Sequence, residues 1–534
     1  MWAALRSRWW AGWARFFPED ATSLGAVGHA ERLRGQSGPV GDDEHAFHDA
    51  SLRELRAIDP NTLAPDEALE HESMLRASAF RTHVLERDQD RRCLELSLHA
   101  QGMIGHRRAH TDDAEELRAR LDAVPGVLAG REIALREGLA RGHAPDRDVL
   151  DVVVGYALPG AERWYRGLSH PSAARAADAT AAHRAFLERE LAPRSEIGAA
   201  RLGEEELTTR FALTYGESID PRVVRASARE AITLLSARLV LSAAHAARAR
   251  GIFVRHLADA HAYVALLFRE AIEGDPRPHY AALLAHATDF AAERRLFTPP
   301  ARPPDFVAIP DGMIHGGAIT NWPAPLLDRS RNGHIALSLA PGAHSIAFAT
   351  GLAIHEGTPG HYLQSAVWQR SASAGHEPVR FVAVHDDVAM ASSFFGAMPS
   401  VEGFAVHAEN VMFEAGFYDR DAEVAALASA IIRAARAAVD VSLHLREATP
   451  EEASQELHRA TGMPLSWCAM QITRFLRIPV QASTYFVGAK RHATMLDAAR
   501  IRRGVGFVAD AFHDALLALG PASLRTLAQR LDQG

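Results

Sequence analysis

Two histidines and a glutamate at the end of an apolar run are the residues of this sequence best suited to chemistry. The segment His355-Glu356-Gly357-Thr358-Pro359-Gly360-His361 follows residues 346–354, which read as a buried helix. Two neutral imidazoles can hold Zn²⁺, and a glutamate beside the first can take a proton from a metal-bound water. The segment therefore predicts a metallohydrolase site, with His355 and His361 as metal ligands and Glu356 as general base.

The spacing of these histidines requires an interruption of the helix. In the common zinc-protease motif the two histidines stand four residues apart, about 40° around one helix. Here the separation is six residues, roughly 120° on an ideal helix. Pro359 removes a backbone donor and Gly360 accepts unusual dihedral angles, so we expect the helix to be bulged or broken between the histidines. The alternative is a pair of buried structural histidines, because the chain contains 28 His.

A third ligand is expected from another element, since catalytic zinc has three protein ligands and an open position. Residues 401–410 read as an apolar helix that carries Glu402 and Glu409 seven residues apart, nearly aligned on one face. We expect Glu402 to be the ligand and Glu409 to support the site from behind. The alternative is that both carboxylates are solvated or paired with arginine.

Residues 425–445 read as a helix that is apolar almost all round, with a stripe of four polar side chains. Arg433, Arg436, Asp440 and His444 fall within roughly 80° of one another at about 100° per residue. Buried charges at such spacing are unfavourable unless they are paired or used. One interpretation is an internal salt-bridge ladder between Arg436 and Asp440. The functional interpretation places Asp440 behind a ligand histidine and His444 in the cleft as a hydrogen-bond donor to an oxyanion.

A helix that begins after Pro479 carries two further polar side chains on one face. Gln481 and Tyr485 stand four residues apart. A tyrosine hydroxyl near a metal-bound carbonyl can stabilise a tetrahedral intermediate. A buried tyrosine that is satisfied by a backbone carbonyl is the alternative.

These motifs resemble the bacterial domain of unknown function 885 family, a group of large, mostly helical proteins similar to gluzincin metallopeptidases. The resemblance rests on residues 355–364, 402–405, 433–444 and 481–488, and on the opening segment 17–25. It spans nearly the whole chain, and the Pro-Gly pair between the histidines is its specific part. The resemblance implies a large helical zincin-like metallohydrolase body.

The resemblance also implies roles for single residues. His355, His361 and Glu402 would bind the metal and Glu356 would be the general base, with His444 and Tyr485 polarising the substrate. The sequence departs from the family pattern where Tyr362 replaces a third His, and where Phe404 and His407 replace the usual Trp and Tyr. The departures spare every implied ligand but alter the expected shape of the pocket.

Composition limits the class of protein. The chain has 534 residues, 48% hydrophobic and 23% charged, with a net charge of −8, which argues against nucleic-acid binding. Two cysteines and the lack of a convincing signal peptide predict a cytoplasmic location. No run approaches the ~20 apolar residues of a membrane span. The Trp- and Arg-rich residues 1–17 could contact a membrane surface, but a helix docked on the body is favoured.

We expect a mainly α protein with a small β element beside the metal helix. Residues 1–17 would be an aromatic and basic helix, 18–295 a helical wall of the cleft, and 296–534 the metal-binding catalytic region, possibly in one continuous domain. Segments 306–310 and 334–339 read as strands, and the latter, if exposed, could pair with an extended peptide.

The predicted function is zinc-dependent hydrolysis of peptides or small amide-containing molecules. Two alternatives are a dedicated amide or ester hydrolase for a specialised metabolite and a non-catalytic protein with a structural metal. A redox iron site is a weaker rival. Arg433 and Arg436 also hint at recognition of a substrate carboxylate, although a salt-bridge role explains them equally well.

Overall fold

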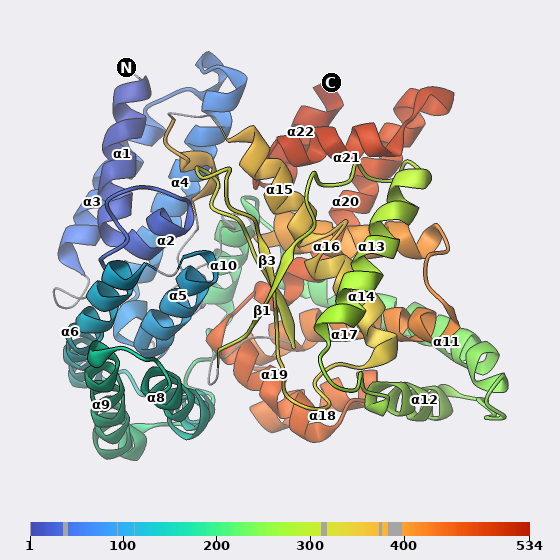
Figure 1. The fold of residues 1–534 in the computed structure, drawn as a ribbon, viewed down its shortest axis with the longest axis horizontal. Helices are drawn as coiled ribbons and strands as arrows, with labels where there is room; N and C mark the ends of the chain where they lie inside the picture. Colours follow the sequence, from blue (N-terminus) through green and yellow to red (C-terminus); the bar gives the residue numbers. More distant parts are fainter. Residues whose placement is uncertain are drawn as a thin grey trace.

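The computed structural model describes residues 2–35, 41–92, 94, 96–111, 113–310, 318–372, 376–382 and 398–533, and it is mainly α-helical with one small sheet (Figure 1). The helices before the sheet are α1 Trp2–Phe16, α2 Pro18–Ser23, α3 Asp42–Arg56, α4 Pro65–Glu86, α5 Leu96–His110, α6 Ala114–Ala140, α7 Arg147–Val152, α8 Leu158–Arg166, α9 Pro171–Phe186, α10 Glu204–Tyr215, α11 Pro221–Arg248, α12 Leu257–Arg269 and α13 Arg277–Glu293. The helices after it are α14 Ile346–Glu356, α15 His361–Ser371, α16 Met398–Glu414, α17 Arg420–His444, α18 Pro450–Thr461, α19 Leu465–Arg477, α20 Gln481–Arg503, α21 Ala509–Ala518 and α22 Leu524–Gln533. The predicted fold class, mainly α with a small β element, is confirmed.

Several helices begin where local sequence signals place them. The Asp220 carboxylate accepts the backbone N–H of Arg222 at 2.8 Å, and Pro221 is the first residue of α11. Asp113 accepts the N–H groups of Glu115 and Glu116, both at 2.9 Å, at the start of α6. Such side chains satisfy backbone donors that a helix leaves free in its first turn. These caps fix the ends of long helices that form the body of the molecule.

The sheet has the order β1-β3-β2, with β1 Asp305–Ala308, β2 Ile319–Trp322 and β3 His334–Leu337. Strand β3 pairs in parallel with β1 and antiparallel with β2. Every residue of β3 is buried, so the exposure that pairing with an extended peptide would require is not present in this strand. The edge strand β2, which no alternating pattern in the sequence predicts, is instead the strand that contacts Glu356.

The N-terminal helix α1 lies against the body through its aromatic face. Trp9 and Trp13 are buried, and they share a hydrophobic cluster with Trp368 and Phe381 from the second half of the chain. The Trp9 and Trp13 rings are stacked with centroids 6.2 Å apart. Trp2 and Phe17 are buried as well, whereas Trp10 and Phe16 are half-buried, so most of the aromatic face of this segment packs against the body. Among the described helices, none combines the length and the apolar character needed to cross a bilayer.

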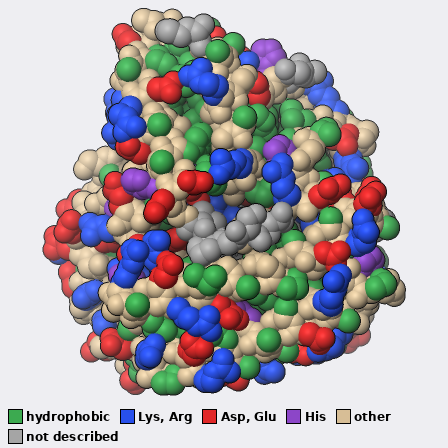
Figure 2. All heavy atoms as spheres, turned by 90° about the vertical axis from the view of Figure 1, so that its left-hand side faces the viewer, with side chains coloured by type: hydrophobic (Ala, Val, Ile, Leu, Met, Phe, Trp, Pro, Cys, Tyr) green, Lys and Arg blue, Asp and Glu red, His purple; other side chains and the backbone are tan. Residues whose placement is uncertain are grey.

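The hydrophobic core joins segments that are distant in the sequence. One cluster packs Phe211 of α10 against Ile354 of α14, Phe404 of α16 and Met495 of α20. Helices α11 and α17 lie side by side across the right-hand half of Figure 1. On the face that carries the N-terminal helices, acidic and basic side chains are intermixed (Figure 2). The division at residues 17 and 295 stays a prediction.

Candidate metal centre

The two histidines of the motif are brought together by a break between helices. Helix α14 ends at Glu356 and α15 begins at His361, so the predicted interruption is confirmed. The turn is closed by a hydrogen bond of 2.9 Å from the Gly360 N–H to the Ile354 carbonyl. A Cβ atom on Gly360 would lie 2.0 Å from the His355 carbonyl oxygen, so only glycine fits there. The rings of His355 and His361 meet edge to face, with centroids 4.7 Å apart.

Glu402 of α16 completes a set of three metal-ligating side chains with these histidines. One donor atom from each residue lies within 4.8 Å of the other two. The Glu402 Oε2 atom is 3.5 Å from His355 Nε2 and 3.3 Å from His361 Nε2. Two imidazoles and one carboxylate are the donor set of a catalytic zinc site with a position left for substrate or water. The residues present therefore fit a zinc ion.

Glu409 fixes the orientation of His355. The Nδ1 atom of His355 lies 2.7 Å from Glu409 Oε1, which leaves Nε2 directed at Glu402. Arg433 of α17 holds the same carboxylate with two hydrogen bonds, 2.7 Å to Oε1 and 2.9 Å to Oε2. A carboxylate behind a ligand histidine sets its tautomer and raises its basicity. Glu409 therefore lies behind His355, in the place expected for a residue that supports the proposed ligands.

His361 is oriented by Gln364, for which no role is predicted from the sequence. The Nδ1 atom of His361 lies 2.9 Å from Gln364 Oε1, and the Gln364 amide donates to the Val401 carbonyl at 3.4 Å. The Nδ1–H of His361 therefore points to Gln364 and its Nε2 atom to Glu402. The two residues are three positions apart on one helix, a spacing that predicts side-chain contact. This spacing is the signal that could have identified Gln364.

Glu356 faces the edge strand β2 beside the cluster. Its Oε2 atom accepts the backbone N–H of Asn321 at 2.7 Å. Burial raises the pKa of Glu356, while the neighbouring His355 and His361 lower it. A raised pKa suits a group that must accept a proton and later release it. Asn321 has no recognisable sequence signal, because the contact is made by a backbone atom.

Tyr485 and Gln481 of α20 contact the carboxylate of Glu402. The Tyr485 hydroxyl donates to Glu402 Oε1 at 3.0 Å, and the Gln481 amide donates to the Tyr485 oxygen at 2.8 Å. Burial, together with the Glu402 charge, raises the pKa of Tyr485 to about 12. The hydroxyl is therefore kept as a hydrogen-bond donor at the edge of the cluster.

Two glycines allow α16 and α20 to cross closely enough to form this contact. A Cβ on Gly403 would lie 2.4 Å from the Gly488 Cα atom, and a Cβ on Gly488 would lie 2.1 Å from the Pro399 carbonyl oxygen. Gly403 follows Glu402, and Gly488 lies less than one turn beyond Tyr485. Small residues at this crossing therefore position both side chains.

The polar stripe of α17 is only partly brought to the cluster. Arg433 contacts Glu409, and the Arg436 guanidinium lies 5.1 Å from the centroid of the Tyr485 ring. Asp440 does not stand behind a ligand histidine; instead its Oδ2 atom accepts the Val480 N–H at 3.2 Å, because the stripe has passed the cluster at this point. Burial raises the pKa of Asp440 to about 8.

His444 lies at the far end of the stripe. Its Nε2 atom donates to the Phe475 carbonyl at 3.0 Å and its Nδ1 atom accepts the Leu202 N–H at 3.4 Å. Eight residues separate it from Arg436, roughly 12 Å along the helix axis. Among the described residues, no hydrogen bond or ion pair joins His444 to the proposed ligands, so the structure places it in a core and not in the cleft.

The charges of the cluster are balanced by protons that a cation would replace. Burial lowers the pKa of His355, but hydrogen bonds to Glu402 and Glu409 outweigh it and raise the pKa to about 9. Burial raises the pKa of Glu402, but hydrogen bonds to both histidines outweigh it and hold the pKa well below its usual value. Because ligand imidazoles must be neutral, binding of a divalent cation here releases a proton.

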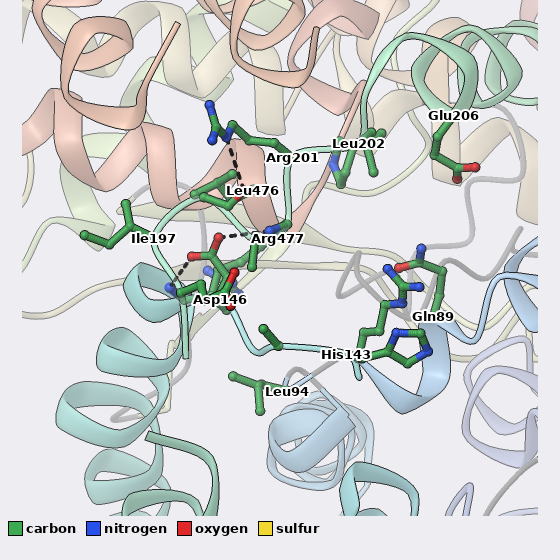
Figure 3. A pocket seen from close by; sticks show the side chains of 18 of the residues that line it. Gln89, Leu94, His143, Asp146, Ile197, Arg201, Leu202, Glu206, Leu476 and Arg477 are labelled. Atoms are coloured by element: carbon green, nitrogen blue, oxygen red, sulfur yellow. Dashed lines mark hydrogen bonds between the residues drawn. The ribbon is translucent and has the colours of Figure 1, made fainter. Parts of the chain in front are cut away.

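A cavity of about 470 Å³ lies apart from this cluster, between the N-terminal helices and the α19–α20 turn. Figure 3 shows Asp146 and Arg477 at one end of it and Gln89 and His143 at the other. The Asp146 carboxylate accepts the Ala200 N–H at 3.0 Å. None of the proposed metal ligands is among its lining residues, and His444 accepts the backbone N–H of one of them, Leu202.

Comparison with other proteins identifies relatives along nearly the whole chain. A family model described as bacterial protein of unknown function (DUF885) matches residues 18–531. A solved structure described as a putative lipoprotein of unknown function from Shewanella oneidensis is similar, with a TM-score of 0.74 and 16% identity over 99% of each chain. A putative lipoprotein from Colwellia psychrerythraea is similar with a TM-score of 0.76 and 15% identity, over 100% of this chain and 98% of that one. No curated protein matches.

Proposed function

This chain belongs to the bacterial DUF885 family, and we propose that it is a zinc-dependent hydrolase of amide or peptide bonds. The observation that carries the proposal is the convergence of His355, His361 and Glu402, whose donor atoms lie within 4.8 Å of one another. Glu356 and Tyr485 adjoin this cluster. A metal site with a neighbouring base and a neighbouring hydrogen-bond donor has the parts that hydrolysis requires.

Each residue of the cluster has a separate role in the proposed reaction. His355, His361 and Glu402 would hold Zn²⁺, which would supply a Lewis acid and lower the pKa of a coordinated water. The Glu356 carboxylate accepts a proton from the attacking water and delivers it to the leaving amine. The Tyr485 hydroxyl, whose oxygen accepts from Gln481 and whose proton points to Glu402 Oε1, would donate that proton to the oxyanion once the Glu402 carboxylate holds the metal.

The number of protein ligands favours a catalytic metal over a structural one. Structural zinc sites are closed by four protein ligands, whereas catalytic sites use three. The described residues supply three at this cluster, since the Glu409 carboxylate is engaged by Arg433 and by the outer nitrogen of His355. A hydrolase dedicated to one specialised metabolite uses the same centre, and a peptide digest compared with a metabolite screen distinguishes the two substrates.

The Glu356→Gln variant tests the proposal. Glutamine keeps the shape of the side chain but cannot take the proton, so kcat should fall by at least about 10²-fold while the bound zinc remains. Zinc content is measured by elemental analysis and turnover on a peptide library. The matched control is Glu414→Gln, an exposed position on α16. Wild-type turnover in Glu356→Gln would exclude Glu356 as the base, and absence of zinc from the wild type would exclude the metal.

A further inference from the structure

Arg436 presents buried hydrogen-bond donors for which the described part of the chain offers no acceptor. Its Nε and Nη2 atoms are buried without a partner, although the side chain as a whole stays partly exposed. Its guanidinium stacks over Tyr485, at 5.1 Å from the ring centroid, and over Phe475, at 5.8 Å. Stacking holds the guanidinium plane in place but satisfies none of its N–H groups.

Arg474 of α19 adds a second guanidinium of the same kind. Its Nε atom is buried without a partner, and its Nη2 atom reaches Gln481 Oε1 only at 3.5 Å. The pKa of Arg436 is lowered to about 10, mainly by burial and to a smaller extent by repulsion from Arg474. Two like charges held close together in a buried setting are unfavourable unless an anion lies between them.

The carboxyl groups around these arginines do not pair with them. Glu409 is held by both terminal nitrogens of Arg433. Asp440 accepts the backbone N–H of Val480 through Oδ2, while its Oδ1 atom, 3.5 Å from His444 Nε2, has no hydrogen-bond partner among the described residues. Glu402 faces the two ligand histidines and Tyr485. Within the described ranges, neither Arg436 nor Arg474 forms an ion pair with a carboxylate. A salt-bridge ladder between Arg436 and Asp440 therefore does not account for the stripe.

The two guanidiniums lie one side chain away from the proposed metal ligand. Gln481 contacts Arg474 at 3.5 Å and lies 3.4 Å from Glu402 Oε1 through its amide. Tyr485 lies under Arg436 and donates to the same Glu402 atom at 3.0 Å. An anion bound by both arginines would thus sit close to the bond that the centre cleaves.

We propose that Arg436 and Arg474 form a carboxylate subsite, which selects substrates with a free C-terminus one or two residues beyond the scissile bond. This inference rests on the proposed function and makes the enzyme a C-terminal exopeptidase. Each residue of an extended chain spans at most ~3.3–3.6 Å, which matches a subsite separated from the ligand by one side chain. The planar guanidinium binds carboxylates through two parallel hydrogen bonds, a geometry that lysine lacks.

Binding is measured first, because it does not depend on turnover. N-acetylated tripeptides that end in Ala, Leu, Phe or Arg are titrated calorimetrically into zinc-loaded protein carrying Glu356→Gln. Each peptide is used as the free acid and as the C-terminal carboxamide. We expect at least one free acid to bind tenfold or more tightly than its amide. Equal affinity of both forms throughout the panel, or no binding of any, would overturn the subsite.

Substitutions then assign the preference to the two arginines. Arg436→Gln and Arg474→Gln should each lower the affinity for the free acid at least tenfold and leave the affinity for the amide unchanged. Arg436→Lys, which keeps the charge without the planar fork, should retain part of the preference. Arg420→Gln, at an exposed position on α17, is the matched control. A loss of affinity that is equal for acid and amide would show that the arginines only support the fold, and would contradict the proposal.

Turnover separates this inference from the proposed function. If the wild type cleaves the free acids but not the carboxamides, and Arg436→Gln raises KM with little change in kcat, the hydrolase and the subsite are both supported. If it cleaves acids and amides equally, the hydrolase stands and the subsite fails. If it binds acids selectively but cleaves no peptide, the subsite stands and the peptidase proposal fails.

Discussion

At the scale of single residues, we expect the carboxylate of Glu409 to determine how strongly the proposed centre holds a metal. It accepts the outer N–H of His355 at 2.7 Å and is itself fixed by Arg433. Loss of such a partner typically weakens metal binding by about 10–100-fold. We therefore expect Glu409→Gln to lower zinc affinity by that factor, measured by competition with a chelator. Glu414→Gln, exposed on the same helix, should bind zinc like the wild type; equal affinity in Glu409→Gln would refute the role.

The hydroxyl of Tyr485 is expected to act on the reaction and not on the metal. Removing one oxyanion donor commonly lowers kcat by about 10²–10³-fold. Tyr485→Phe should therefore show a drop of this order with zinc content unchanged, because Tyr485 touches Glu402 but is not a ligand. Steady-state kinetics with elemental analysis measures both, and Tyr156→Phe, at an exposed tyrosine, is the control. A variant that loses zinc along with activity would show that the hydroxyl supports Glu402 instead.

The sequence predicts the residues of the centre where the signal is local. Short spacing identifies His355 and His361, and an acidic face on an apolar helix identifies Glu402 and Glu409. The prediction is wrong for His444. Periodicity along α17 shows which side chains share a stripe, but it does not show where the neighbouring helices end. The stripe runs past the cluster, so only its first half contributes.

At the scale of elements, the crossing of α16 and α20 holds Glu402 beside Tyr485. A Cβ on Gly403 would lie 2.4 Å from backbone atoms of Gly488, which cannot move aside without separating the helices. Gly403→Ala should therefore destabilise the protein by about 1–3 kcal/mol and weaken zinc binding. Urea unfolding and zinc titration measure the two effects.

Gly155→Ala is the control for this crossing, because a Cβ there meets nothing within 4 Å. If Gly403→Ala were as stable as that control, the helices would not be packed as closely as described.

The strands were less predictable than the helices. The start of a helix can be predicted from adjacent residues such as Asp220 and Pro221, and the structure confirms this start. Strand β2 has only four residues and lacks an alternating pattern, yet its backbone contacts Glu356. The sequence predicts a strand at residues 334–339, but the central place of β3 in the sheet depends on β1 and β2, which other segments of the chain supply. Local patterns thus identify elements and do not fix their neighbours.

At the scale of the whole molecule, helices from both halves of the sequence share one core, so the centre depends on the entire body. Phe211 packs with Ile354 and Phe404, which are close in sequence to the proposed ligands His355 and Glu402. The family match over residues 18–531 agrees with that extent. A cytoplasmic location stays a prediction.

Buried histidines make the stability of this body depend on pH. Burial lowers the pKa of His444 from 6.5 to about 4, against a hydrogen bond to the Phe475 carbonyl that raises it. The unfolded chain therefore takes up the proton first, and the stabilising contribution, complete above pH 6.5, is lost as the pH falls towards 4. For this one group the loss is on the order of 2 kcal/mol at pH 5.

The variant His444→Gln tests this linkage, since glutamine can still donate to Phe475 but does not titrate. Between pH 7.5 and pH 5, the free energy of unfolding should fall by about 2 kcal/mol less in the variant than in the wild type. Urea unfolding at each pH gives both values, and His245→Gln, at an exposed position, should follow the wild type. Parallel pH profiles for wild type and His444→Gln would mean that His444 is protonated in the folded protein, and would place it back among the groups that water can reach.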